Sequence, residues 1–158
     1  MTETDYAWLA GIVDGEGSFV ISRTRVQENR VGFSYRGAMN ISNTSEEMMK
    51  HILKITGVGN LTRLPESRFD WKDRFNYNAS AGAVRVLLPK IMPYLVLKRP
   101  QAEVMTEFLG LIGGQGCKVA YDGRIDFLYQ KMRALNMKGK QPKLEPYLVH
   151  ASRPQVQD

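Results

Sequence analysis

The chain has 158 residues, 43% of them hydrophobic, which is typical of one globular domain with a core of its own. Its 22 lysines and arginines outnumber 16 acidic residues, so the net charge of +6 favours a polyanionic partner, with nucleic acid foremost. The single cysteine, Cys117, excludes an intrachain disulfide, no paired cysteines or histidines indicate zinc, and no apolar run of about 18 residues predicts a membrane span.

The N-terminus is acidic where a signal or transit peptide would be basic. We therefore expect no targeting signal and no membrane. The protein would work where it is made, in a bacterial or archaeal cytoplasm, or in an organelle matrix if an organelle genome encodes it.

The first predicted element is a short helix over residues 6–13, with Thr4 as its N-cap. Ala7, Gly11 and Gly15 lie four residues apart on one face of it. Glycine inside a helix costs about 1 kcal/mol relative to alanine, so this face is expected to serve close approach by another helix.

Two carboxylates follow this helix among glycines. Gly15 and Gly17 are expected to turn the backbone into a strand over residues 18–26, which leaves Glu16 at the corner. A carboxylate beside free carbonyl groups suits a hard divalent cation such as Mg²⁺. The alternative is that Asp14 and Glu16 are solvated residues of a glycine-rich turn.

The remaining elements follow from alternation and capping signals. A hairpin turn over 27–30 leads to an alternating strand over 33–42. Ser45 is the expected N-cap of a helix that runs to residue 55 and ends at Gly57. Strands over 60–64 and 74–80 and helices over 83–92 and 100–112 complete the unit. The predicted fold is α+β, in the order αββαββα, with helices on one face of a four-stranded antiparallel sheet.

The second face of this sheet is expected to carry hydrogen-bonding side chains with few acids. Such a face is either solvated or suited to reading base edges in a major groove. Further arginines at a strand end (Arg23, Arg25) and in the hairpin loops (Arg30, Arg68) are candidates for phosphate contacts. The outward set is Ser22, Thr24, Ser34, Arg36, Asn40, Ser42, Asn60, Thr62, Arg74, Asn76 and Asn78.

Residues 9–17, Leu-Ala-Gly-Ile-Val-Asp-Gly-Glu-Gly, resemble the signature of the LAGLIDADG homing endonucleases. Gly-Val-Gly-Asn at 57–60 and Pro-Tyr-Leu-Val-Leu-Lys-Arg-Pro-Gln-Ala at 93–102 extend the resemblance, which spans residues 6 to about 110. In such proteins the signature helix forms the dimer or pseudo-dimer interface, and its final acid binds the catalytic metal. The resemblance implies a homodimer of the single-motif type, with Ala7, Ala10, Gly11 and Gly15 at the interface.

The implied activity is Mg²⁺-dependent, site-specific cleavage of double-stranded DNA, of the intron-encoded homing type. By this resemblance Glu16 and the Gly15 carbonyl bind the metal, and Lys98 lies at the scissile phosphate. Asn43 would orient water, and Gln101 is a further catalytic candidate. Ca²⁺ would bind without supporting cleavage, and the target would be long and pseudo-palindromic. Glu47 stands where similar enzymes place a basic residue. The resemblance therefore does not define which residues would form the basic pocket around the scissile phosphate.

A second signature-like run at residues 108–116 has glycine and glutamine in place of both acids, and the remaining chain is too short for a second repeat. We expect an endonuclease-like core over 1–112 and a helical extension with a basic tail over 113–158. The helix would start after Asp122 and run to about residue 135. The tail either follows the phosphate backbone or is disordered.

Rival functions remain on the same fold, because folds do not fix functions. One is an RNA maturase or a non-cleaving DNA-binding regulator. Another is a non-catalytic oligomerisation domain, which leaves the basic charge unexplained. His51, inside a predicted helix, and His150, in the tail, are expected to be structural or surface residues rather than general bases.

Overall fold

The computed structural model describes residues 1–25, 33–113 and 123–137. The predicted αββαββα order and the α+β class are confirmed, and a further helix follows the unit. The elements are α1 (Glu3–Glu16), β1 (Gly17–Arg25), β2 (Phe33–Asn43), α2 (Glu46–Thr56), β3 (Asn60–Leu64), β4 (Arg74–Ser80), α3 (Ala81–Ile91), the 3₁₀ turn η1 (Met92–Tyr94), α4 (Arg99–Ile112) and α5 (Gly123–Asn136).

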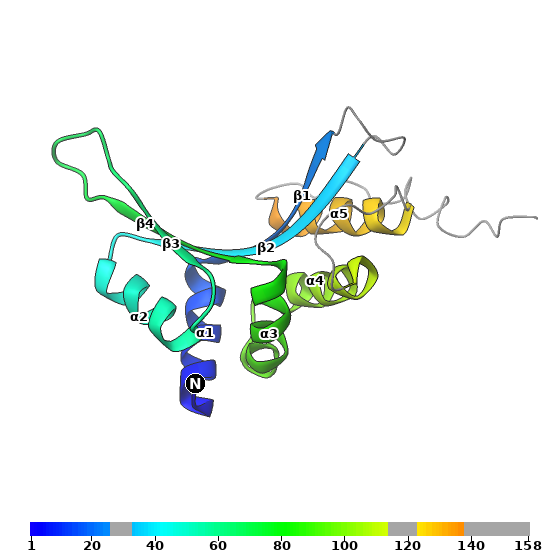
Figure 1. The fold of residues 1–158 in the computed structure, drawn as a ribbon, viewed down its shortest axis with the longest axis horizontal. Helices are drawn as coiled ribbons and strands as arrows, with labels where there is room; N and C mark the ends of the chain where they lie inside the picture. Colours follow the sequence, from blue (N-terminus) through cyan, green and yellow to red (C-terminus); the bar gives the residue numbers. More distant parts are fainter. Residues whose placement is uncertain (26–32, 114–122, 138–158) are drawn as a thin grey trace, which may run out of the picture.

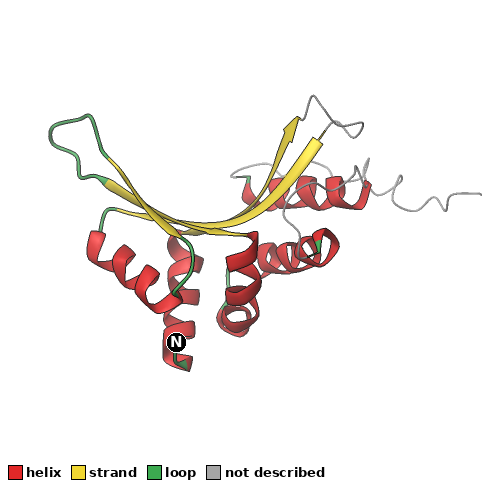
Figure 2. Cartoon of the chain, viewed as in Figure 1, coloured by secondary structure: helices red, strands yellow, loops and turns green. Residues whose placement is uncertain are grey.

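The four strands form one antiparallel sheet in the order β1-β2-β4-β3. Figure 1 shows a strongly curved sheet whose concave side is open and whose other side is covered by α1 to α4. The secondary-structure colouring of Figure 2 makes the two layers plain, with α5 beneath the arm that β1 and β2 form. No helix among the described residues is long and apolar enough to cross a membrane.

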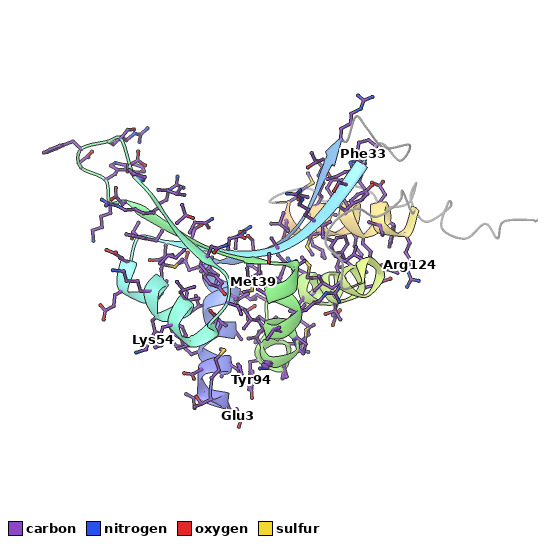
Figure 3. All side chains as sticks on the ribbon, in the orientation of Figure 1. Glu3, Phe33, Met39, Lys54, Tyr94 and Arg124 are labelled. Atoms are coloured by element: carbon purple, nitrogen blue, oxygen red, sulfur yellow. The ribbon has the colours of Figure 1, made fainter. Side chains whose placement is uncertain are left out.

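The hydrophobic core lies between the sheet and the helices. Period-2 alternation in the strands sends Phe19, Tyr35 and Met39 toward the helices, and each is fully buried. Met39 lies at the centre of the molecule beneath the curve of the sheet (Figure 3). The helices bury Leu9, Val13, Met49, Leu88, Met105 and Phe108 against it.

Local signals set the ends of α2 as expected. The Ser45 hydroxyl accepts from the Met48 amide at 3.3 Å, and Gly57 ends the helix with a φ of 64°, a conformation that glycine adopts without a steric penalty. Helix α1 differs from expectation, because it begins earlier and ends later than residues 6–13.

The predicted Thr4 cap is wrong. Thr2 caps α1 instead, in a capping box where its hydroxyl accepts from the Asp5 amide and the Asp5 carboxylate accepts from the Thr2 amide at 2.7 Å. At the other end the helix continues through Gly15 to Glu16, so Gly15 is helical rather than part of a turn.

The corner from α1 into β1 depends on Gly17. A Cβ at this position would lie 2.6 Å from the Val13 carbonyl oxygen, which is closer than real Cβ contacts allow. The strand therefore leaves the helix with the backbone in direct contact with the preceding turn.

Helix α5 packs against β1 and α4. The Asn136 side-chain amide donates to the Phe19 carbonyl at 2.8 Å, and the Asp126 carboxylate accepts from the Tyr35 hydroxyl at 2.8 Å. Burial, together with this bond, raises the pKa of Tyr35. The predicted Asp122 cap and the tail lie outside the described residues.

We expect Gly17→Ala to lower the free energy of unfolding by about 1–3 kcal/mol, because its methyl group must displace the α1 backbone. Urea unfolding followed by circular dichroism measures this. Gly82→Ala is the matched control, since a Cβ at Gly82 meets nothing within 4 Å. Equal stabilities of the two variants would contradict the close approach at Gly17.

Candidate functional site

The site centres on Asp14, which joins the end of α1 to the segment before α4. Its two carboxylate oxygens accept from the backbone amides of Val96 at 2.7 Å and Lys98 at 2.8 Å. Burial acts to raise the pKa of Asp14, but these amides, with that of Leu97 and the Lys98 charge, outweigh it, so the pKa lies below its ordinary value. Asp14 is therefore an ionised clamp rather than a solvated turn residue.

Lys98 is the N-cap residue of α4, and its side chain turns back to α1. Its ammonium group donates to the Asp14 carbonyl at 3.2 Å. Lys98 thus contacts α1 through both its backbone amide and its side chain. A second tie fixes the other end of α1, where the Tyr94 hydroxyl donates to the Glu3 carboxylate at 2.8 Å, as Figure 3 shows at the foot of the molecule.

Glu16 is the last residue of α1 and is exposed. It follows Asp14 by two residues, so the Asp14 clamp holds Glu16 and Lys98 in one neighbourhood. A carboxylate at the carbonyl end of a helix offers the hard oxygen donors that Mg²⁺ and Ca²⁺ prefer, so Glu16 and the Gly15 carbonyl fit such an ion chemically. Among the described residues no three His, Cys, Asp or Glu side chains form a metal-holding group.

Asn43 and Gln101 make local contacts instead of joining this cluster. The Asn43 side-chain oxygen accepts from the Ser45 amide at 2.8 Å, which closes the turn into α2. The Gln101 amide nitrogen donates to the Leu135 carbonyl at 3.2 Å, and its buried oxygen has no partner. The geometry favours docking of α5 as the role of Gln101, and catalysis by either residue stays a prediction.

The small-residue face of α1 is open. Ala7, Gly11 and Gly15 are exposed, and a Cβ at either glycine would meet nothing within 4 Å. Ala10 is wrong as an interface residue, because it is fully buried in the core between Leu9 and Val13. Trp8, 37% exposed beside this face, packs edge-on against His51, so His51 has the surface role that the sequence predicts.

The concave face of the sheet carries the predicted polar side chains. Strand register aligns Asn40 with Asn78 and Asn78 with Asn60 in a row across the sheet. Ser42 donates to the Asn76 side-chain oxygen at 2.8 Å one row further along. The remaining members on this face are Ser22, Thr24, Ser34, Arg36, Thr62 and Arg74.

The Arg23 guanidinium pairs with Asp126 at 2.8 Å and lies over the rings of Phe33 and Tyr129, so it joins the end of β1 to α5. A phosphate contact by Arg23 stays a prediction. Arg25 is exposed at the end of β1 and remains a candidate. Arg68 lies over the Trp71 ring at 4.7 Å in the β3–β4 loop, and Arg30 lies outside the described residues.

Neither the contacts of Asp14 nor the exposed rings of Phe69 and Trp71 are among the features predicted from the sequence. The amide partners of Asp14 come more than eighty residues later, so no local signal indicates them. The aromatic residues were visible in the polar loop after Pro65, where alternation with basic residues is a signal for nucleic-acid contact.

A single αββαββα unit, with an exposed acid at the end of its first helix and a polar concave sheet, defines the class of the protein. The chain belongs to the LAGLIDADG endonuclease family, whose model matches residues 9–99, more than half of its length. The resemblance of residues 9–17 to the family signature is therefore confirmed.

Known relatives agree with this assignment. The DNA endonuclease I-CvuI of Chlorella vulgaris is 27% identical over 106 residues, which are 66% of this chain and 63% of that protein, so the match spans just under two thirds of the relative. The crystal structure of I-CvuI with its target in the presence of Ca superposes with a TM-score of 0.68 at 21% identity, covering 93% of this chain and 92% of that one.

Two other solved structures share the fold. The archaeal intron-encoded homing endonuclease I-Vdi141I, complexed with DNA, gives a TM-score of 0.72 at 17% identity over 93% of this chain and 94% of that one. The LAGLIDADG homing endonuclease I-SmaMI, bound to cleaved DNA, gives 0.66 at 17% identity. All of this chain is covered there, but only 52% of I-SmaMI, so this chain matches about half of that one.

We expect Asp14→Asn to lower the free energy of unfolding by about 2 kcal/mol at pH 7, because charge-assisted bonds to two backbone amides are lost. The lowered pKa means that the carboxylate stabilises the fold above pH 3.8, its ordinary value, and that this contribution disappears as pH falls through the lowered pKa. Urea unfolding at pH 7 and near pH 3 should show the difference shrinking. Asp70→Asn, in the exposed loop, should change stability little at either pH.

Proposed function

We propose that this chain is a site-specific DNA endonuclease of the homing type, which hydrolyses phosphodiesters with a divalent metal at an interface between two copies. The observation that carries the proposal is the joint placement of Glu16 and Lys98 by Asp14, at the end of the helix whose small-residue face is open. An acid can hold the metal in metal-assisted phosphodiester hydrolysis, and a nearby cation can stabilise the charge that develops on the phosphate.

Duplex DNA is the partner that the concave face supports. Rows of amide and hydroxyl side chains cross the sheet, and these groups pair with base edges in the major groove, which admits a β-ribbon. I-CvuI and I-Vdi141I are both known in complex with DNA. The net charge of +6 supports the same partner electrostatically.

A second copy of the chain is the partner that α1 supports. The inner face of α1 packs Leu9 and Val13 into the core. The outer face of α1 presents Ala7, Gly11 and Gly15, which allow two helix backbones to approach closely. The chain matches about half of I-SmaMI, as one unit of a paired arrangement would. A symmetric pair would recognise a long, pseudo-palindromic site.

The roles of the residues follow from this pairing. Glu16 and the Gly15 carbonyl of each copy would hold Mg²⁺, which when bound would supply an activated water and neutralise charge on the scissile phosphate. The Lys98 ammonium stabilises negative charge that develops on the phosphate oxygens. Ca²⁺, which accepts the same oxygen donors with looser geometry, would hold the protein on DNA without supporting cleavage.

The test begins with selection. Purified protein in Ca²⁺ is incubated with a pool of randomised duplexes, and the bound fraction is sequenced to give a consensus site. We expect a pseudo-palindrome that wild type cuts on both strands in Mg²⁺. A consensus that is bound but never cut would instead support a DNA-binding regulator. If no duplex is enriched and the protein binds structured RNA instead, the result would support a maturase.

Glu16→Gln should abolish cutting of the selected duplex and leave its affinity in Ca²⁺ within a few-fold of wild type. We expect the cleavage rate in Mg²⁺ to fall at least about a hundredfold, because the metal-binding charge is lost. Glu103→Gln, a change of the same chemistry at an exposed position of α4, is the matched control. Undiminished cleavage by Glu16→Gln would remove Glu16 from the site.

Gly11→Leu should separate the two copies. A leucine on the open face of α1 prevents close helix approach, so we expect sedimentation to show a folded monomer where wild type is a dimer. Gly110→Leu is the control, because Gly110 is an exposed glycine on α4 with nothing within 4 Å. A Gly11→Leu variant that stays dimeric would place the interface elsewhere.

A further inference from the structure

The β3–β4 loop, residues 65–73, presents aromatic rings to solvent. Phe69 is fully exposed and Trp71 is 58% exposed. A fully exposed phenylalanine forgoes the 1.5–3 kcal/mol or so that burial of such a side chain contributes, so this loop contributes no packing through its most apolar residue. Its rings are instead placed where a partner would meet them.

Specific contacts hold the loop in shape. The Trp71 amide donates to the Arg68 carbonyl at 3.1 Å, which closes a tight turn around Phe69. The Arg68 guanidinium lies over the Trp71 ring at 4.7 Å. At the base of the loop, Asp73 accepts from the Glu66 amide at 3.0 Å and pairs with Arg63. The turn therefore displays Phe69 on a braced support.

A basic hollow lies beside the turn. It has a volume of about 780 Å³ and is lined by Arg68, Lys72 and Arg74 with Thr44 from the β2–α2 corner. Glu66 is the one acid in its lining, and its carboxylate accepts from the adjacent Ser67 amide at 3.0 Å. Three cations around an open hollow suit the phosphates of a nucleic-acid backbone.

The loop continues directly from two strands of the concave face. Strands β3 and β4 carry Asn60, Thr62 and Asn76, and Figure 1 shows the loop rising beyond them at the far end of the sheet, on its open side. A duplex bound along the concave face would extend past this tip. Along one side of a B-form duplex the minor groove follows the major groove, so the loop beyond the strands would face a minor groove.

Building on the proposed DNA binding, we propose that the β3–β4 loop is a wedge for the duplex flanking the sheet. Phe69 enters the minor groove and partly unstacks a base step, while Arg68, Lys72 and Arg74 hold the adjacent phosphates. Apolar wedges between basic residues kink DNA in this way, and the kink brings more backbone onto the protein. Trp71 supports the wedge through its contact with Arg68.

The test uses the duplex selected from the randomised pool, with 2-aminopurine placed singly at successive flanking steps. We expect wild type in Ca²⁺ to raise the fluorescence at one step on each side, because that base loses its stacking. Phe69→Ala should abolish the rise and weaken binding of the long duplex roughly tenfold. Phe69→Leu, which keeps an apolar wedge, should retain most of the signal.

A control variant and a control duplex separate the effect of Phe69 from general effects on binding. Val86→Ala trims an exposed apolar side chain on α3, 51% exposed, and should change nothing. A truncated duplex without flanks should bind wild type and Phe69→Ala equally. An unchanged 2-aminopurine signal in wild type, or equal long-duplex affinities of wild type and Phe69→Ala, would overturn the wedge. Absence of any duplex binding by wild type would instead overturn the proposed function.

Discussion

The bonds from Asp14 to the backbone before α4 are the constraint on which the rest of the site depends. Glu16 is the last residue of the first helix, and Lys98 lies more than eighty residues later, between η1 and α4. The two residues therefore share no helix or strand. The Asp14 carboxylate accepts from Val96 and Lys98, and its carbonyl accepts from the Lys98 ammonium. Asp14 therefore fixes Lys98 against the end of α1, the helix whose last residue is Glu16.

Helix α1 packs one face into the core and leaves another face open, and the chain turns into β1 at Gly17 directly after the helix ends. Its inner side places Leu9, Ala10 and Val13 in the core, while Ala7, Gly11 and Gly15 stay open on the outer side. Because the chain turns sharply at Gly17 into β1, Glu16 lies at the junction of helix and sheet. The acid proposed to bind metal, the helix face proposed to pair with a second copy and the sheet face proposed to meet DNA thus lie at one corner of the fold.

The sequence predicted most of the fold because its signals are local. Alternation in β2, the Ser45 cap and the Gly57 stop each lie within a few residues of the element they define. The end of α1 differs from the prediction because Gly15 resembles a helix breaker, and its start differs because Thr2 and Asp5 form a capping box ahead of Thr4. Arg23 and Asp14 depend on α5 and on the segment before α4, and such distant partners leave no periodic signal. Lys98 is predicted from family resemblance alone, whereas Glu16 is also indicated by its place at a glycine-flanked helix end.

The central claim is that one chain holds half of a cleavage site. It is tested most directly by mixing wild type with Glu16→Gln at fixed total concentration, allowing subunits to exchange, and measuring the rate of double-strand cleavage of the selected duplex. If both copies must supply their acid, the rate falls with the square of the wild-type fraction. A rate that falls in direct proportion to that fraction would mean that each chain cuts alone, and would contradict the account.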